Sequence, residues 1–394
     1  MIKKIILLFL FWRGFLFGSI SIASQFIAYR KGYEYTSVNH FLSNPHSLIS
    51  NFLLSPWSNF DGVYYLLIAA NGYTVNAGFF PLFPFFLHVV TSAFGRVLAF
   101  DPIQYYTALL LVSLFLLLSL ITLYKLVKLD YKDNIAIFAI FYMLFFPTSF
   151  FFATIYSESL FLLLCVSSFY FARQKRWFLA SLCGGLLTAT RLVGIAIIPA
   201  LIIEFIRSDP TSSPSAGLRG VRKTLYKKKN LFLLFTPLGI LGYMWFNLEK
   251  WGDTFYFIQA QGDFQNNRSV TSLVFIPQTI FRYINILTTL SPGIFEWWIA
   301  LLEISTFIFV SIMFFVAWKK KIRISYILFA LICFLIPVSS GTFTGLPRYA
   351  LVLFPIFIAI ALIKNKVIKI CYSTIGFILL FLLFMLFSKG YYIA

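Results

Sequence analysis

Apolar runs close to the length of a membrane span recur along the whole chain. A helix needs about 20 consecutive apolar residues to cross the hydrocarbon core of a bilayer. Only 11% of the residues are charged, whereas a soluble domain carries about 25%. The sequence therefore predicts an all-α fold, a polytopic transmembrane helical bundle, and excludes an ordinary soluble enzyme.

We expect about eleven spans, at residues 4–27, 103–124, 134–151, 156–172, 177–190, 194–206, 231–249, 297–318, 324–340, 347–363 and 370–387. The chain is predicted to form a single integral membrane domain, residues 1–394. A long first external loop with juxtamembrane helices is expected over about 29–102. A basic cytoplasmic loop is expected over about 207–229, and a second external loop over about 250–296.

The net charge of +19 could suggest a nucleic-acid partner. Lys and Arg are, however, concentrated in short loops between apolar runs, which is the positive-inside pattern of membrane topology. These loops are 125–132, 173–176, 207–229, 319–323 and 364–369. We therefore expect membrane lipids as partners and no nucleic acid.

All five basic loops fall on one side only if the apolar segment 79–98 does not cross the membrane. Pro81 and Pro84 stand near its start and also disfavour a regular span. We predict that this segment is a juxtamembrane helix in the first external loop.

With this topology, segment 177–206 must begin and end in the cytoplasm. At 1.5 Å per residue each half reaches only about 20 Å, so we predict two half-length helices that meet at Thr190, Arg191 and Leu192. Non-helical backbone at membrane depth occurs where it is buried in protein or lines a cavity. Arg191 is therefore expected to point into a polar cavity that opens to the outer face.

Asp61 is the main catalytic candidate. It lies in the polar stretch W-S-N-F-D-G-V-Y-Y-L-L, directly before a predicted helix from Val63 to Ala70. Its simplest role would be to cap that helix, because Asp is a favoured N-cap residue. Ionisable groups beside or inside apolar segments are costly, which makes a shared functional cavity the alternative.

Further polar and aromatic residues fall on the same predicted external face. The candidates for substrate binding are Trp57, Tyr65, Tyr156, Glu158, Asp253 and Gln261, and the candidates for binding a donor phosphate are Arg191 and Arg348. Each of them also has a structural explanation, such as a helix start for Glu158, a turn for Asp253 or an interface anchor for Arg348.

A single carboxylate beside arginines is suited to sugar transfer from a lipid phosphate. A glycosidase needs a second carboxylic acid to protonate its leaving group, whereas a departing phosphate needs none. One carboxylate can take the proton of an acceptor hydroxyl, and an arginine can bind the phosphate. The few His and scattered Cys residues indicate no metal site, and we expect no cofactor.

The motifs F-D-G-V-Y-Y-L-L-I-A-A-N-G-Y and F-F-P-L-F-P resemble the signature of the GPI mannosyltransferase 2 (PIG-V-like) family, in the GT-C superfamily of membrane glycosyltransferases. The resemblance continues in P-T-S-F-F-F-A-T-I-Y-S-E-S-L-F, L-T-A-T-R-L-V-G, W-G-D-T-F-Y-F-I-Q-A-Q and L-P-R-Y. It implies a catalytic carboxylate at Asp61. It also implies a polyprenyl- or dolichyl-phosphate sugar donor, most often of mannose, and no nucleotide-sugar site.

One departure from the family pattern concerns the acceptor. Asn59 and Phe60 precede Asp61, where eukaryotic members usually carry Trp or Arg. The compact, basic, Phe- and Lys-rich chain is typical of a prokaryotic member, for which GPI is not the expected acceptor. The sequence thus predicts inverting transfer to a lipid or glycan hydroxyl, with the active site on the extracytoplasmic face of the cell membrane.

Two other functions are compatible with the sequence. A multi-pass transporter or lipid flippase would suit the broken segment 177–206, although no second broken segment is visible at a matching position. A non-enzymatic scaffold subunit would keep the fold without a need for Asp61. The sequence predicts neither the exact sugar nor the oligomeric state.

Overall fold

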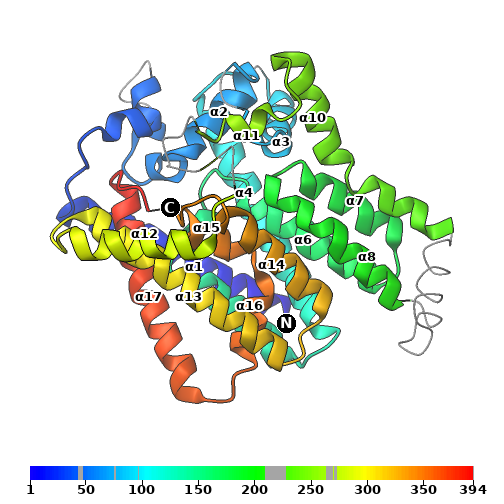
Figure 1. The fold of residues 1–394 in the computed structure, drawn as a ribbon. Helices are drawn as coiled ribbons and strands as arrows, with labels where there is room; N and C mark the ends of the chain where they lie inside the picture. Colours follow the sequence, from blue (N-terminus) through cyan, green and yellow to red (C-terminus); the bar gives the residue numbers. More distant parts are fainter. Residues whose placement is uncertain are drawn as a thin grey trace.

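The computed structural model describes residues 1–42, 48–74, 77–95, 97–208, 228–262, 269 and 273–393. These residues form helices, turns and loops, and no strand occurs among them (Figure 1). The prediction of an all-α bundle is confirmed. Most of the predicted basic loop 207–229 lies outside the described residues.

The first half of the chain contains α1 (Ile2–Phe26), α2 (Asp61–Asn71), α3 (Leu82–Ser92), α4 (Pro102–Lys128), α5 (Asp133–Leu144), α6 (Glu158–Arg173), α7 (Trp177–Thr188) and α8 (Ile197–Ser208). The second half contains α10 (Leu238–Trp251), α11 (Tyr256–Gln259), α12 (Ile276–Thr289), α13 (Phe295–Lys319), α14 (Ile324–Val338), α15 (Leu346–Tyr349), α16 (Phe354–Ala361) and α17 (Lys366–Ser388). Short 3-10 helices are η1 (Tyr33–Thr36), η2 (Val38–Phe41), η3 (Leu48–Ser50), η4 (Ser55–Ser58), η5 (Ser149–Phe152), η6 (Leu192–Ala196), η9 (Lys228–Phe235) and η11 (Ala350–Val352).

Five described helical segments are long and apolar enough to cross a bilayer. They are Ile2–Phe26, Pro102–Lys128, Leu231–Trp251, Phe295–Lys319 and Lys366–Ser388. The other predicted spans correspond to shorter helices, so the count of eleven stays a prediction.

Proline explains why two of the predicted spans are divided. The predicted span 134–151 stops being helical after Leu144, because the residue before a proline disfavours the helical conformation and Pro147 follows closely. The predicted span 347–363 is divided into α15, η11 and α16, and α15 and α16 each carry a proline in the first turn. The candidate Tyr156 follows the first of these interrupted stretches, and the candidate Arg348 lies in the second.

The helix in the predicted juxtamembrane segment is short. α3 contains 11 residues, about 16 Å of helix, which is too little to cross the hydrocarbon core. It packs against α2 and α4, near the top of the view in Figure 1. This length agrees with the prediction that segment 79–98 does not span the membrane.

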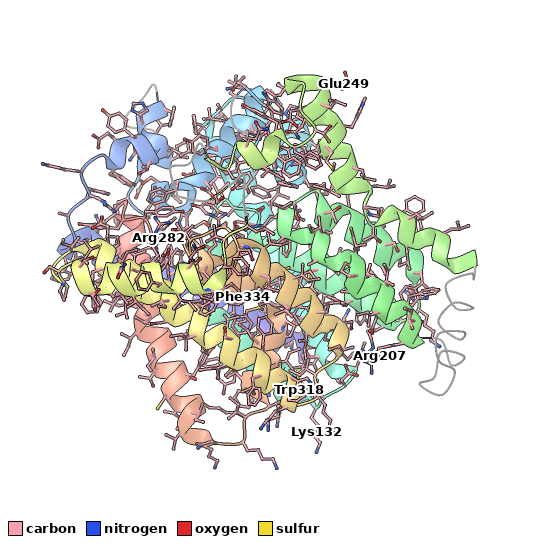
Figure 2. The ribbon with its side chains drawn as sticks, in the orientation of Figure 1. Lys132, Arg207, Glu249, Arg282, Trp318 and Phe334 are labelled. Carbon is pink, nitrogen blue, oxygen red and sulfur yellow. The ribbon has the colours of Figure 1, made fainter. Side chains whose placement is uncertain are left out.

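Ion pairs join three of the predicted basic loops at one end of the molecule. Arg173 Nη1 lies 2.5 Å from Asp130 Oδ2. Arg173 Nε and Arg323 Nη2 lie 3.6 and 2.9 Å from the same atom, Oε1 of the buried Glu204 in α8. Figure 2 places Lys132 and Arg207 toward the same end and Glu249 at the opposite one. The common side of these loops agrees with the sequence, while the identity of that side as cytoplasmic stays a prediction.

Two glycines allow α7 and α10 to approach each other closely. A Cβ atom on Gly239 would lie 2.0 Å from the carbonyl oxygen of Gly185, and one on Gly185 would lie 2.5 Å from the carbonyl oxygen of Phe235. A methyl group at either position would overlap a backbone carbonyl, which cannot move aside as a flexible side chain can. This contact fixes α7, the first half of the broken segment, against α10.

We expect Gly239→Ala to destabilise the protein by about 1–3 kcal/mol, because the added methyl group overpacks this crossing. The measurement is the thermal midpoint of unfolding in detergent. Gly242→Ala is the matched control on the same helix, because a Cβ there would meet nothing within 4 Å. The control should be neutral or more stable by up to about 1 kcal/mol. Equal midpoints for both variants would contradict the close crossing.

Candidate functional site

Asp61 begins α2, but it does not cap the helix. The N-cap residue is Phe60, and Asp61 is the first helical residue. The sequence-based assignment of Asp61 as N-cap was therefore wrong. Its side chain is 23% exposed and is directed toward Arg348, with Oδ2 lying 2.5 Å from Nη1 of the arginine. The carboxylate is free of a capping role and belongs to the site.

The backbone of Phe60 explains the shift of the helix start. Phe60 has φ 60° and ψ −114°, a conformation that costs a non-glycine residue about 1–3 kcal/mol. Its N–H donates to the carbonyl of Thr36 at 2.8 Å, and its ring contacts Phe387 and Tyr392 at the end of the chain. The strained residue turns the chain so that Asp61 enters the cavity.

Glu158 lies at the centre of the charged group. It is the first residue of α6, and its side chain is fully buried. Its Oε1 accepts hydrogen bonds from both Arg191 and Arg348. A buried carboxylate requires such partners, because desolvation of an unpaired charge is very costly. Glu158 therefore holds the two arginines side by side.

Arg191 occupies the break that the sequence predicted. α7 ends at Thr188, Arg191 has an extended backbone with φ −159° and ψ 150°, and η6 begins at Leu192. The guanidinium lies over the ring of Tyr349 with 4.9 Å to the centroid, which is a cation–π distance. The predicted pair of half-length helices with Arg191 between them is confirmed.

Arg348 joins the two carboxylates. It is carried by the single-turn helix α15, and it donates from Nη1 to Asp61 and from Nε to Glu158. Its guanidinium lies 4.5 Å from the ring centroid of Tyr156, which covers its face. Asp61, Glu158, Arg191 and Arg348 thus form one continuous group with equal numbers of acidic and basic side chains.

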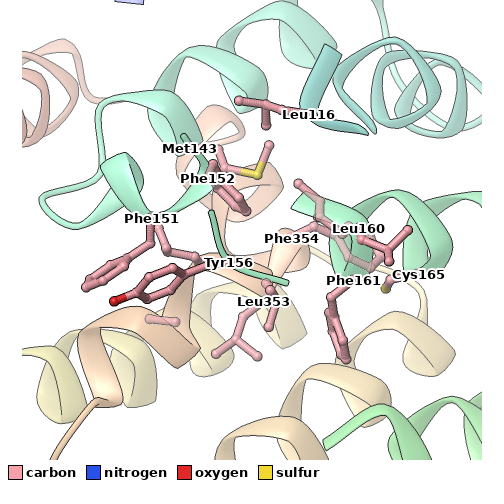
Figure 3. Packing of buried hydrophobic residues seen from close by; sticks show 14 of the residues in the cluster. Leu116, Met143, Phe151, Phe152, Tyr156, Leu160, Phe161, Cys165, Leu353 and Phe354 are labelled. Carbon is pink, nitrogen blue, oxygen red and sulfur yellow. The ribbon is translucent and has the colours of Figure 1, made fainter. Parts of the chain in front are cut away.

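Two tyrosines fix the segments that carry the carboxylates. The Tyr156 hydroxyl donates to the carbonyl of Asn59 at 2.7 Å and accepts the N–H of Asp61 at 3.2 Å. Figure 3 shows Tyr156 packed beside Phe151. Burial raises the pKa of the Tyr65 phenol, so that it stays protonated at neutral pH and donates to Ser157 at 2.9 Å.

The charged group forms part of the wall of a cavity of about 740 Å³. This volume is within the usual range of small-molecule sites, about 300–1,000 Å³. The polar lining includes Asp61, Tyr65, Thr190, Arg191, Gln261 and Arg348. The aromatic lining includes Phe41, Phe60, Tyr64, Phe79, Phe80, Tyr349 and Tyr392. The cavity therefore combines a charged wall, formed by Asp61, Arg191 and Arg348, with broad apolar surfaces.

Two of the sequence candidates lie elsewhere. Trp57 is fully buried, donates to the carbonyl of Leu53 at 2.8 Å, and does not line the cavity. Asp253 lies in a turn, where it accepts from the N–H of Phe255 and from Gln259. The cavity lining does not include Asp253 either. Gln261, in contrast, lines the cavity and donates to the carbonyl of Gly78 at 3.0 Å.

The sequence did not single out two tyrosines of the site. Tyr349 follows Arg348 directly in the motif L-P-R-Y, and its ring supports Arg191. Its position beside a candidate arginine could have indicated that Tyr349 belongs to the site. Tyr392 lines the cavity near the end of the chain, and no local pattern indicates that it lies there.

The apolar helices define a membrane protein, and the charged group adjoins a cavity within it. Residues 4–208 match the family described as Mannosyltransferase (PIG-V), which is more than half of the chain. The chain belongs to this family, and the resemblance stated from the motifs is confirmed.

One solved structure with a similar course of the chain is an oligosaccharyltransferase from Archaeoglobus fulgidus, tethered with an acceptor peptide. The identity is 12% and the TM-score 0.45, over 97% of this chain and 55% of that one. The chain thus spans little more than half the length of that protein. No curated protein matches the sequence.

Proposed function

We propose that the protein transfers a mannosyl residue from a polyprenyl-phosphate donor to a hydroxyl group of a lipid or glycan acceptor. One observation carries the proposal: Asp61 lies on the cavity wall, and two arginines stand beside it. Asp61 is the most exposed of the four charged side chains, at 23%, whereas each arginine is 11% exposed and Glu158 is fully buried. Asp61 is therefore the group that an acceptor can reach.

In the proposed reaction the acceptor oxygen bonds to the anomeric carbon of the sugar as its bond to the phosphate oxygen breaks. Asp61 takes the hydroxyl proton, and the bonding electrons leave with the phosphate. The arginines bind the phosphate, which needs no protonation to depart. Because the attack occurs on the face opposite the leaving group, the product has the inverted anomeric configuration.

The donor phosphate must compete for Arg348. In the structure this arginine donates from Nη1 to Asp61 and from Nε to Glu158. A phosphate bound to Nη1 would take the place of Asp61, and the released carboxylate would then face the acceptor. In this proposal, donor binding releases Asp61 from Arg348, so that the carboxylate can accept the proton of the acceptor hydroxyl.

Two interrupted segments favour the transporter alternative. α7 and α8 are separated at Arg191, and α15, η11 and α16 form a second discontinuous stretch. Transporters place their substrates between such broken helices. Against this reading, the chain belongs to a mannosyltransferase family.

The decisive experiment incubates purified protein with radiolabelled polyprenyl-phosphate-mannose and a panel of lipid and glycan hydroxyl acceptors. We expect a mannosylated product by mass spectrometry and an inverted anomer by linkage-specific mannosidase digestion. A product of retained configuration would contradict the mechanism. Movement of the donor between vesicle leaflets without any product would support the transporter instead.

A further inference from the structure

Glu303 is a buried carboxyl group in the middle of a long apolar helix. It lies in α13, one of the segments long enough to span a membrane, and only 4% of it is exposed. An acidic group at such a place is costly and usually has a functional reason. It is not one of the residues that line the cavity.

Glu303 is linked to the turn 341–345 directly and through a tyrosine of α12. Its Oε1 accepts the backbone N–H of Gly345 at 3.2 Å, and its Oε2 accepts the hydroxyl of Tyr283 from α12 at 2.5 Å. The same Tyr283 hydroxyl accepts the N–H of Phe343 at 3.0 Å. Two side chains from two other helices thus hold two backbone N–H groups of the turn 341–345.

This turn leads directly to Arg348. It is bounded by two glycines in the left-handed region, Gly341 with φ 83° and Gly345 with φ 79°. The carbonyl of Gly345 then accepts the N–H groups of Arg348 and Tyr349, at 3.0 and 3.1 Å. A single residue therefore connects the carboxyl of Glu303 to the first turn of the helix that carries Arg348.

We propose that Glu303 is a positioning residue that fixes the turn 341–345 and, through it, the guanidinium of Arg348. The guanidinium needs this support because it must reach Asp61 and Glu158 with different nitrogens. The helix that carries this side chain has only four residues, and the turn 341–345 is the segment that leads into it. The consequence for catalysis rests on the proposed function, whereas the consequence for the turn does not.

Hydrogen exchange, followed by mass spectrometry on peptides that cover residues 339–350, tests the positioning itself. In Glu303→Ala we expect the amides of this turn to exchange at least about tenfold faster, the scale for loss of a hydrogen bond to a carboxyl group. Glu303→Gln keeps one acceptor oxygen for Gly345 and should remain within about threefold of the wild type. Unchanged exchange in Glu303→Ala would overturn the proposal.

Two further variants distinguish a local effect on the turn from a general loss of folding. Thr306→Val is the matched control, because Thr306 is similarly buried on α13 but bonds only to its own helix, at the carbonyl of Leu302. It should leave exchange in the turn unchanged. Tyr283→Phe removes one hydroxyl and should speed exchange at Phe343. If Glu303→Ala does not fold, faster exchange at Phe343 in Tyr283→Phe supports the proposal, and unchanged exchange there overturns it.

Transfer kinetics then test the link to Arg348, with polyprenyl-phosphate-mannose as the donor. We expect Glu303→Ala to lower kcat/KM for the donor by about 10- to 100-fold, the scale for a catalytic group displaced by about 1 Å. In an Arg348→Lys background the same change should cost less than about threefold, because coupled residues are not additive. Fully multiplicative losses would overturn the proposal. An inactive wild-type protein would refute the proposed function but leave the exchange result standing.

Discussion

Replacing Asp61 by Asn is expected to reduce mannosyl transfer by about 10²- to 10⁴-fold, the usual scale for loss of a general base. The amide has nearly the same size as the carboxylate and cannot accept the hydroxyl proton. Arg348 retains its bond to Glu158 in this variant, so no charge is left without a partner. The measurement is the initial rate of transfer at saturating donor and acceptor.

The control for this variant is Asp101→Asn. Asp101 also stands at a helix start in the first predicted external loop, where its side chain caps α4 by accepting the N–H of Ile103. Asn caps a helix about as well as Asp, so the control should fold and transfer sugar normally. Full activity in a folded Asp61→Asn protein would contradict the assignment of Asp61 as the base and leave it only its ion pair with Arg348.

The second large effect is expected from Arg348→Lys. A guanidinium can donate from two nitrogens in fixed directions, and here Nε and Nη1 reach different carboxylates. An ammonium group keeps the charge but cannot hold both partners in this geometry. We expect the dissociation constant of the donor to rise about 10- to 100-fold, as for the loss of one hydrogen bond between charged groups.

Donor affinity can be measured by titration with a short-chain polyprenyl-phosphate-mannose in detergent. Arg191→Lys should show the same direction of change, because Arg191 shares Oε1 of Glu158. Arg30→Lys is the control, since Arg30 forms an exposed ion pair with Glu296 away from the cavity lining. Normal donor binding by both site variants would show that the arginines serve only to neutralise the buried carboxylate.

The broken segment at Arg191 was predictable because charge and length together leave few solutions. The basic loops before and after segment 177–206 are expected on the same side of the membrane. The segment is too short for two full spans, so its helix must be interrupted. The structure places that break between Thr188 and Leu192. Hydropathy alone would have given a single long helix.

The contacts between the charged residues were not predictable in the same way. Arg348 and Asp61 are far apart in sequence, and no local pattern indicates that both converge on Glu158. The N-cap assignment of Asp61 failed because it assumed an ordinary backbone at Phe60, whose positive φ is imposed by tertiary packing. The preference of Asp for N-cap positions reflects local structure and does not account for that packing.

Glu303 is a different case, because a signal for it was present. A carboxyl group inside an apolar run is unusual in any spanning helix and indicates a buried partner. The sequence does not say which partner, and the turn 341–345 could be identified only from the structure. A carboxyl group inside an apolar span therefore predicts a hydrogen-bond partner on another segment of the chain.

The sharing of Arg348 between two carboxylates has a consequence for charge during turnover. In the proposed reaction a phosphodiester with one negative charge becomes a phosphomonoester with close to two, while Asp61 gains a proton and becomes neutral. The total charge of the site is the same before and after transfer, and only its location changes. An arginine between the two positions follows this change by reorienting its guanidinium. The transfer step then conserves the charge within the cavity, and no counterion has to enter the protein during it; Asp61 releases its proton before the next turnover.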